Sequence, residues 1–235
     1  SQVVTDIIAL TNIDGNKSLE FKKEKFTICE LLKRKINIFH LTERLIQQYA
    51  TTTGHEIPHG RADLLDILKT YPVKNGAQFE EILVGLNGIS PRLYTIASSP
   101  AAHEGEVHIV VVKDTFIAND KKRFGICSDF LSKLKLNSTQ QFFVQPNKRF
   151  RPPAENKDII MVGPGTGIAA FRSFLAERDA TGASGRNWLF FGEQHFASDF
   201  LYQTEIQNWH ETGVLTNINL AFSRDQKEKI YVQHK

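Results

Sequence analysis

Apolar residues in the first 90 positions recur with the spacing of amphipathic helices. In several separate stretches they lie three or four positions apart, which is the period of a helix with one buried face. A turn at residues 14–16 and a proline at position 72 separate such stretches. Helices are predicted at residues 1–12, 27–49, 63–70 and 79–86. The N-terminal block is therefore predicted to be mostly helical.

From residue 92 the pattern changes to the alternation that is typical of strands. In the clearest stretch, residues 106–113, valine or isoleucine fills five of eight positions, which favours a strand over a helix. Strands are predicted at residues 92–98, 106–113 and 141–145, with a turn and short helix within 125–134. Prolines at positions 146, 152 and 153 mark a linker.

Beyond residue 157, strand and helix patterns alternate regularly. Strands are predicted at residues 158–162, 187–191 and 218–221, and helices at 168–178 and 199–212. This alternation indicates a doubly wound parallel sheet of the Rossmann-like kind. The chain as a whole is predicted to be α/β plus β.

Composition narrows the class of protein. A chain of 235 residues suggests one large domain or two small ones. The net charge of +3 is too small to indicate binding to nucleic acid or to an anionic membrane. No unbroken apolar run approaches the length of a membrane span. Cys29 and Cys127 have no metal-ligand spacing, and a reducing, cytoplasmic setting is predicted.

A glycine-rich segment at residues 163–167 (Gly-Pro-Gly-Thr-Gly) lies between a predicted strand and a predicted helix. Glycines let a phosphate approach the backbone, and a helix N-terminus offers free N–H groups to it. The spacing is shorter than the usual dinucleotide fingerprint. The segment is thus either a tight turn or a pyrophosphate site, and its strand–turn–helix context favours the second.

Hydroxyl and cationic residues follow the last predicted strand. Ser223 and Arg224 end it, and Lys229 and Tyr231 come shortly after. Ligands of open parallel sheets bind beyond the carboxyl ends of the strands, and these side chains suit a dianionic phosphate. That chemistry indicates NADPH rather than NADH. The alternative is a solvated charged loop, because acidic residues are interspersed there.

The stretch 92–99 (Arg-Leu-Tyr-Thr-Ile-Ala-Ser-Ser) combines a cation, an aromatic ring and several hydroxyls. Alternation places Arg92 and Tyr94 on one face. A flavin ring needs a flat aromatic partner, and its pyrophosphate needs a cation. When the stretch is taken alone, a plain surface strand is the better explanation of the same residues.

Taken in order, five segments together resemble the FAD/NADPH module of the diflavin reductases. They are residues 92–99, 125–128, 161–171, 187–201 and 223–233. Residues 187–192 and 223–229 are particularly similar to flavoprotein subunits of the NADPH-dependent sulfite reductase type. The resemblance covers essentially the whole chain and is more specific from residue 87 onward.

The resemblance implies a role for each matching position. Arg92 would hold the FAD pyrophosphate, Tyr94 would stack on the isoalloxazine, and Thr95 would be the catalytic hydroxyl near flavin N5. FAD contacts are implied for Arg92, Leu93, Tyr94, Thr95, Gly125, Ile126, Cys127 and Ser128. NADPH contacts are implied for Gly163, Gly165, Thr166, Gly167, Ser223, Arg224, Lys229, Ile230, Tyr231, Val232 and Gln233.

The implied organisation is a FAD-binding region at residues 1–153 and an NADP-binding domain at 154–235. Within the first, a helical connecting insertion would span about residues 1–88, and strands of a partial antiparallel barrel would span about 89–153. The implied reaction is hydride transfer from NADPH to FAD. Electrons would then pass to an FMN-carrying, flavodoxin-like domain and to the hemoprotein subunit, in assimilatory sulfite reduction.

Two alternatives stay open at this point. One is a diflavin reductase for another acceptor, such as a cytochrome or methionine synthase, and the other is an inactive dinucleotide-binding fragment. Two substitutions depart from the family pattern: Thr95 replaces a serine, and Ala170 replaces a proline. The family also continues beyond both ends of this chain, so we expect a piece of a longer protein with weak FAD retention.

Overall fold

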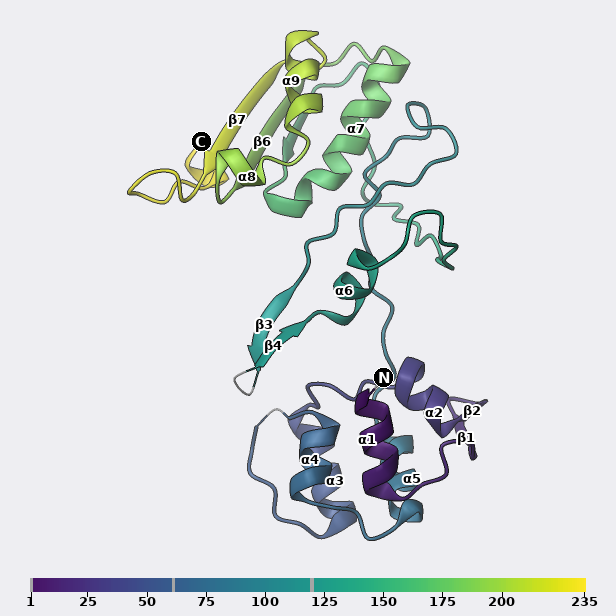
Figure 1. Ribbon diagram of the computed structural model, residues 1–235. Helices are drawn as coiled ribbons and strands as arrows, with labels where there is room; N and C mark the ends of the chain where they lie inside the picture. Colours follow the sequence, from purple (N-terminus) through teal and green to yellow (C-terminus); the bar gives the residue numbers. More distant parts are fainter. Residues whose placement is uncertain (1, 61, 119–120) are drawn as a thin grey trace. The chain divides into compact units, whose positions relative to one another are not determined.

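The computed structural model describes residues 2–60, 62–118 and 121–235. The chain divides into two compact units, Ser1–Pro91 and Arg92–Lys235. Figure 1 labels the helices and strands of both units.

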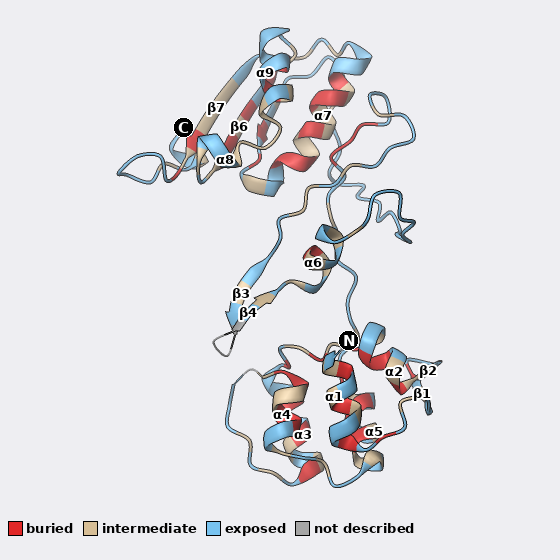
Figure 2. Cartoon of the chain, viewed as in Figure 1, coloured by how far each residue is buried: buried red, intermediate tan, exposed pale blue. Residues whose placement is uncertain are grey.

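The first unit is mostly helical. The helices are α1 (Gln2–Thr11), α2 (Ile28–Glu30) with a π-helical turn at Leu31–Lys35, α3 (Glu43–Thr53), α4 (Leu64–Thr70) and α5 (Gly76–Gly85). An antiparallel hairpin, β1 (Ser18–Phe21) with β2 (Glu24–Thr27), was not among the sequence predictions. The inward faces of these helices are buried (Figure 2) and form one apolar core that includes Ile7, Leu31, Tyr49, Leu64 and Phe79.

The helix predicted for residues 27–49 is wrong over its middle. The chain leaves the helical conformation at Ile36 and re-enters it at Glu43. Ile36 and Ile38 are both buried while the residue between them is less so, which is the period of an extended chain rather than of a helix. Single bridges to Gly88 and Ala62 hold this stretch, so tertiary pairing overrides the local pattern.

The strands predicted at residues 92–98, 106–113 and 141–145 do not form ladders. The first two meet only at a single antiparallel bridge, Ile96 with Ile109. A ladder forms instead between β3 (Thr115–Ala118) and β4 (Lys121–Phe124), followed by the predicted short helix α6 (Ile126–Ser132).

A strand persists only where a partner takes up its backbone N–H and C=O groups, and alternation alone supplies no partner. Leu93, Val107 and Val112 accordingly stay more than half exposed. The small antiparallel pairs fit part of a barrel, but a barrel is not confirmed.

The predicted parallel sheet of the second unit is confirmed. Its strands are β5 (Ile159–Val162), β6 (Asn187–Glu193) and β7 (Asn217–Phe222), in the order β5-β6-β7 and all parallel. The connecting helices are α7 (Ile168–Thr181), α8 (Phe196–Asp199) and α9 (Gln203–Glu211), with 3-10 turns at Gly165–Gly167 and Val232–His234. The helix predicted for 199–212 corresponds to α9, which begins later, at Gln203, and the short helix α8 before it was not predicted.

Strand β6 is the centre of this sheet. Leu189 and Phe191 are fully buried beneath α7 and α9, which cover one face of the sheet (Figure 1). On the other face Ile160 is 66% exposed, and Trp188 stacks on Phe190 with a centroid distance of 5.2 Å. The hydrophobic stabilisation of the unit is therefore concentrated on the helix-covered face.

The last turn of the chain packs over the carboxyl end of the sheet. A Cβ atom at Gly192 would lie 2.8 Å from Val232 Cγ1, so only glycine leaves room for that turn. This contact places the turn Val232–His234 beside β6 and β7. Among the described residues, no helix is both long enough and apolar enough to cross a membrane.

The asymmetry of the sheet gives a stability prediction. Leu189→Ala should lower the free energy of unfolding of the second unit by about 2–5 kcal/mol, because it removes buried methyl groups and leaves a cavity. Denaturant unfolding followed by tryptophan fluorescence measures this, since Trp188 and Trp209 both lie in this unit. The control Ile160→Ala, on the exposed face, should change little, and a loss as large as that of Leu189→Ala would contradict the assignment of the buried face.

Candidate functional site

The glycine turn joins β5 to α7, and its geometry requires glycine at two positions. Gly163 donates its N–H to Phe190 O at 2.9 Å, and a Cβ there would lie 2.7 Å from the ring of Phe171. Gly165 has a φ of +57°, a conformation that L side chains rarely adopt. At Gly167 the nearest atom to a Cβ would be 3.9 Å away, so packing against the protein does not require glycine there.

The turn presents free backbone donors. Among the described residues, the amides of Gly165 and Thr166 have no hydrogen-bond acceptor. They lie immediately before α7, whose N-terminus carries the positive end of the helix dipole. The turn can therefore receive an anionic group such as a phosphate.

A second loop lies at the same edge of the sheet, after β7. Ser223 N and Arg224 N continue the pairing with β6 by donating to Glu193 O and Gln194 O, both at 2.9 Å. The Ser223 hydroxyl is buried and lies 3.4 Å from Glu193 O. These bonds fix the start of the loop to the neighbouring strand.

Asp225 fixes the loop further. Its carboxylate accepts from Phe196 N at 2.8 Å and from His195 Nδ1 at 2.9 Å. These two donors, the backbone N–H first, lower the pKa of Asp225. Its neighbour Arg224 is exposed, and its side chain has no polar partner in the described part of the chain. The loop thus fixes the backbone at Arg224 and leaves its guanidinium exposed.

The final turn adds further donors to this edge. Lys229 and Gln233 are exposed, Tyr231 is 43% exposed, and Ile230 and Val232 are half-buried. The glycine turn, the β7 loop and this final turn all follow the carboxyl ends of parallel strands, where such sheets bind ligands. The structure therefore brings the predicted NADPH-binding residues to one edge of one sheet.

The predicted FAD-binding residues form a separate group. The Tyr94 hydroxyl lies beside the Cys127 thiol, and this hydrogen-bonding neighbour raises the pKa of Tyr94. Burial raises that pKa further, and the charge of Arg92 opposes it. Two segments that are about 30 residues apart in the chain are thereby brought together. Arg92, Leu93 and Thr95 are exposed.

The turn at Gly125 has its own internal bonds. Gly125 N donates to Asp114 O at 2.9 Å. The buried Ser128 hydroxyl accepts from Asp114 N at 3.1 Å and donates to Gly125 O at 3.2 Å. Ser128 therefore shapes the turn from within, while Ile126 is 53% exposed. The resemblance implied a FAD contact for Ser128 and gave no indication that Asp114 is its partner.

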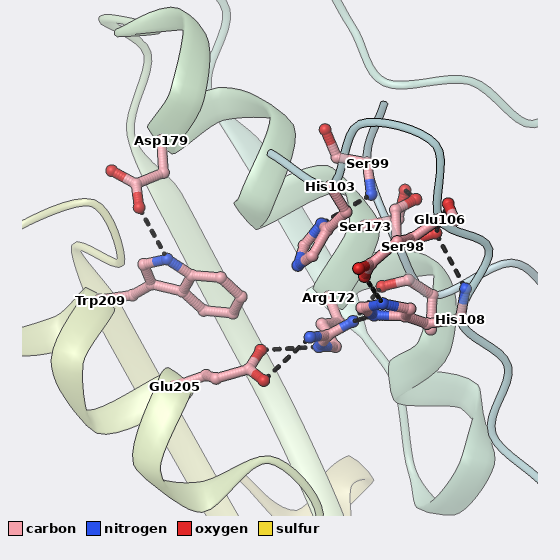
Figure 3. Close-up of polar contacts among 11 residues, drawn as sticks. Ser98, Ser99, His103, Glu106, His108, Arg172, Ser173, Asp179, Glu205 and Trp209 are labelled. Atoms are coloured by element: carbon pink, nitrogen blue, oxygen red, sulfur yellow. Dashed lines mark hydrogen bonds and ion pairs between the residues drawn. The ribbon is translucent and has the colours of Figure 1, made fainter. Parts of the chain in front are cut away.

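Two residues near this group escaped the sequence analysis. Arg172 and Ser173 of α7 donate hydrogen bonds to the carbonyl oxygens of Ala97 and Ser98, just beyond the 92–95 stretch (Figure 3). The only signal in the sequence was an arginine within an otherwise apolar helix face. No group of three or more His, Cys, Asp or Glu side chains suited to a metal ion occurs within the described ranges.

The contact between Tyr94 and Cys127 predicts a titration shift. Cys127→Ala should lower the pKa of Tyr94 toward its usual value, because the thiol no longer stabilises the protonated phenol. Phenolate absorbance followed against pH, with the Tyr94→Phe titration subtracted, isolates Tyr94 from the other four tyrosines. Cys29→Ala is the matched control and should have no effect. A Tyr94 pKa that does not respond to Cys127→Ala would refute the contact.

Comparison with known proteins agrees with this geometry. Residues 161–235 match the family model of the oxidoreductase NAD-binding domain. The sulfite reductase [NADPH] flavoprotein alpha-component of Bacillus subtilis is 43% identical over 88% of this chain and 37% of its own length. Those of Vibrio parahaemolyticus and Zymomonas mobilis are each 38% identical, over 100% and 99% of this chain and 40% and 41% of their own lengths.

The chain thus spans about two fifths of the length of these relatives. The match to the Vibrio parahaemolyticus relative runs through both units of the chain. Over nearly all of its length, the chain is homologous to one part of the sulfite reductase flavoprotein alpha-components.

Proposed function

We propose that this chain binds NADPH and FAD and supports hydride transfer between them, as part of a sulfite reductase flavoprotein. The observation that carries the proposal is the sheet edge, where a glycine turn with free N–H groups lies near a loop with a free guanidinium. An anion that carries phosphate groups at two separate positions suits these two donor sets.

The NADPH pyrophosphate would be held at the glycine turn. Gly163, Gly165 and Gly167 keep the backbone accessible, and the amides of Gly165 and Thr166 point to no protein acceptor among the described residues. The 2′-phosphate would be held by Ser223, Arg224, Lys229, Tyr231 and Gln233. Ile230 and Val232 would supply backbone at the same edge.

FAD would be held by the second group. Arg92 would neutralise its pyrophosphate, and Tyr94 would cover one face of the flavin ring and exclude water there. Thr95 would place its hydroxyl beside the reacting nitrogen of the flavin. The turn at Gly125, with Ile126 and Cys127, would receive a phosphate, and the contact of Cys127 with Tyr94 supports a common ligand for both segments.

When both cofactors are bound, NADPH supplies two electrons and one proton as a hydride to flavin N5 and becomes NADP⁺. The chain contributes position, charge and exclusion of water. We assign residues 154–235 to NADPH, and residues 1–153 to the FAD-binding region with a helical insertion and part of a barrel. In the complete flavoprotein, electrons would pass on to an FMN domain and a hemoprotein partner.

Ferricyanide reduction tests this function. The chain reconstituted with FAD should reduce ferricyanide when NADPH is added, at a rate well above that of free FAD. Binding of NADPH without any turnover would contradict the reductase function and leave a dinucleotide-binding segment.

Cofactor preference gives a sharper test of the β7 loop. Arg224→Ala should weaken NADPH binding by roughly 10- to 100-fold, which corresponds to a charge-assisted hydrogen bond of about 1.5–3 kcal/mol. NADH binding should hardly change, because NADH lacks the 2′-phosphate. Isothermal titration of both nucleotides measures the difference.

Lys227→Ala is the control for this test, because Lys227 is exposed in the same loop and has no assigned role. It should reduce binding of both nucleotides only slightly. An equal loss of NADPH and NADH binding in Arg224→Ala would refute the assignment of the 2′-phosphate site.

A further inference from the structure

Arg172 is a buried arginine of α7 whose guanidinium makes contacts in several directions (Figure 3). Its Nε and Nη2 atoms donate to the two carboxylate oxygens of Glu205, at 2.6 and 2.9 Å. Its Nη1 atom contacts Ala97 O at 2.8 Å and His108 Nδ1 at 2.9 Å. The ring of Tyr202 lies 4.5 Å from the guanidinium carbon. One side chain thus joins three stretches of the chain.

These contacts connect the two proposed cofactor segments. Arg172 lies in the first turns of α7, the helix that begins directly after the glycine turn. Ala97 lies two residues after Thr95. A second bond repeats the connection, because Ser173 Oγ donates to Ser98 O at 2.8 Å. The backbone that would position the flavin ring is therefore anchored to the helix that would position the nicotinamide nucleotide.

The chemistry of the contact explains why it is an arginine. A buried cation is costly unless it is paired, and here Glu205 pairs it in bidentate fashion. The remaining donors lie in the same rigid plane, so the Glu205 contact fixes the direction in which Nη1 meets Ala97 O. A lysine has the same charge but no such plane.

We propose that Arg172 is a positioning residue for hydride transfer, which sets the separation and orientation of the flavin segment relative to the glycine turn. It acts through the backbone at Ala97, and its side-chain polar contacts are with Glu205, Ala97 and His108. The inference rests on the proposed function. It adds that the rate of flavin reduction depends on a residue outside the set of cofactor contacts.

The experiment compares Arg172→Lys with Arg178→Lys in the full chain. Arg178 is the matched control: it is also buried on α7, but its Nη2 atom donates to the carbonyl oxygens of Glu155, Lys157 and Gly185, away from the flavin segment. Both variants should lose stability to a similar extent, because each loses a planar set of donors in a buried place.

Only Arg172→Lys should slow flavin reduction. In stopped-flow measurements on FAD-loaded protein, its rate of reduction by NADPH should fall roughly 10- to 100-fold, the effect of a small misplacement of reacting groups. The Kd for NADPH should stay within about twofold of the parent value, since no NADPH contact is changed. A rate equal to that of Arg178→Lys would overturn the inference.

Amide hydrogen exchange without cofactors tests the anchoring independently of turnover. Ala97 N donates to His108 O at 2.8 Å, and His108 N donates to Ser98 Oγ at 3.0 Å. Both amides should exchange faster in Arg172→Lys than in the parent, and at the parent rate in Arg178→Lys. Unchanged exchange in Arg172→Lys would overturn the inference even if the parent reduces flavin.

If the parent chain does not reduce flavin, the proposed function fails, and the exchange measurement still decides whether Arg172 anchors the segment. Ser173→Ala serves where Arg172→Lys does not fold. It removes one bond to Ser98 O and should cause smaller changes of the same kind in both rate and exchange. If Ser173→Ala changes neither the rate of flavin reduction nor the amide exchange, the inference is overturned for both anchoring residues, Arg172 and Ser173.

Discussion

The parallel pairing of β6 with β5 on one side and β7 on the other determines where the candidate NADPH residues lie. Because all three strands run the same way, the segments that follow them meet at one edge of the sheet. The pairing continues past β7, where Ser223 and Arg224 bond to residues at the end of β6. These bonds fix the backbone of Arg224 relative to the neighbouring strand, while its guanidinium stays exposed.

The glycines along that edge are explained by different physical causes. At position 163 it avoids the ring of Phe171, at 165 it permits a positive φ, and at 192 it leaves room for Val232. At position 167 a Cβ would meet no protein atom closer than 3.9 Å, so packing does not explain the glycine. Close approach of a ligand to the backbone would explain it. Packing and backbone conformation therefore account for three of these glycines, and the proposed phosphate would account for the fourth.

The sequence predicted the parallel sheet well because each of its strands is an apolar run bounded by a turn and followed by a helical pattern. It failed at residues 92–98 and 106–113, where the apolar pattern is equally clear but pairing reduces to the bridge of Ile96 with Ile109. The local pattern of apolar residues shows which backbone conformation the side chains favour. It does not show whether a partner strand is present. For the same reason, residue type, spacing and resemblance could propose candidate site residues. They could not propose Asp225 and Arg172, which act through partners distant in sequence.

Two buried arginines of helix α7 fix the positions of neighbouring loops, although the small net charge of the chain gives no sign of them. Arg178 satisfies three carbonyl oxygens around the loops that lead into β5 and β6, and Arg172 joins Glu205 of α9 to the backbone at Ala97. An apolar side chain at either place would fill the volume but leave those carbonyl oxygens without donors. The two arginines therefore stabilise specific loop positions, which hydrophobic burial alone does not specify. Since α7 also begins at the glycine turn, one helix relates the sheet edge to the segment that carries Tyr94 and Thr95.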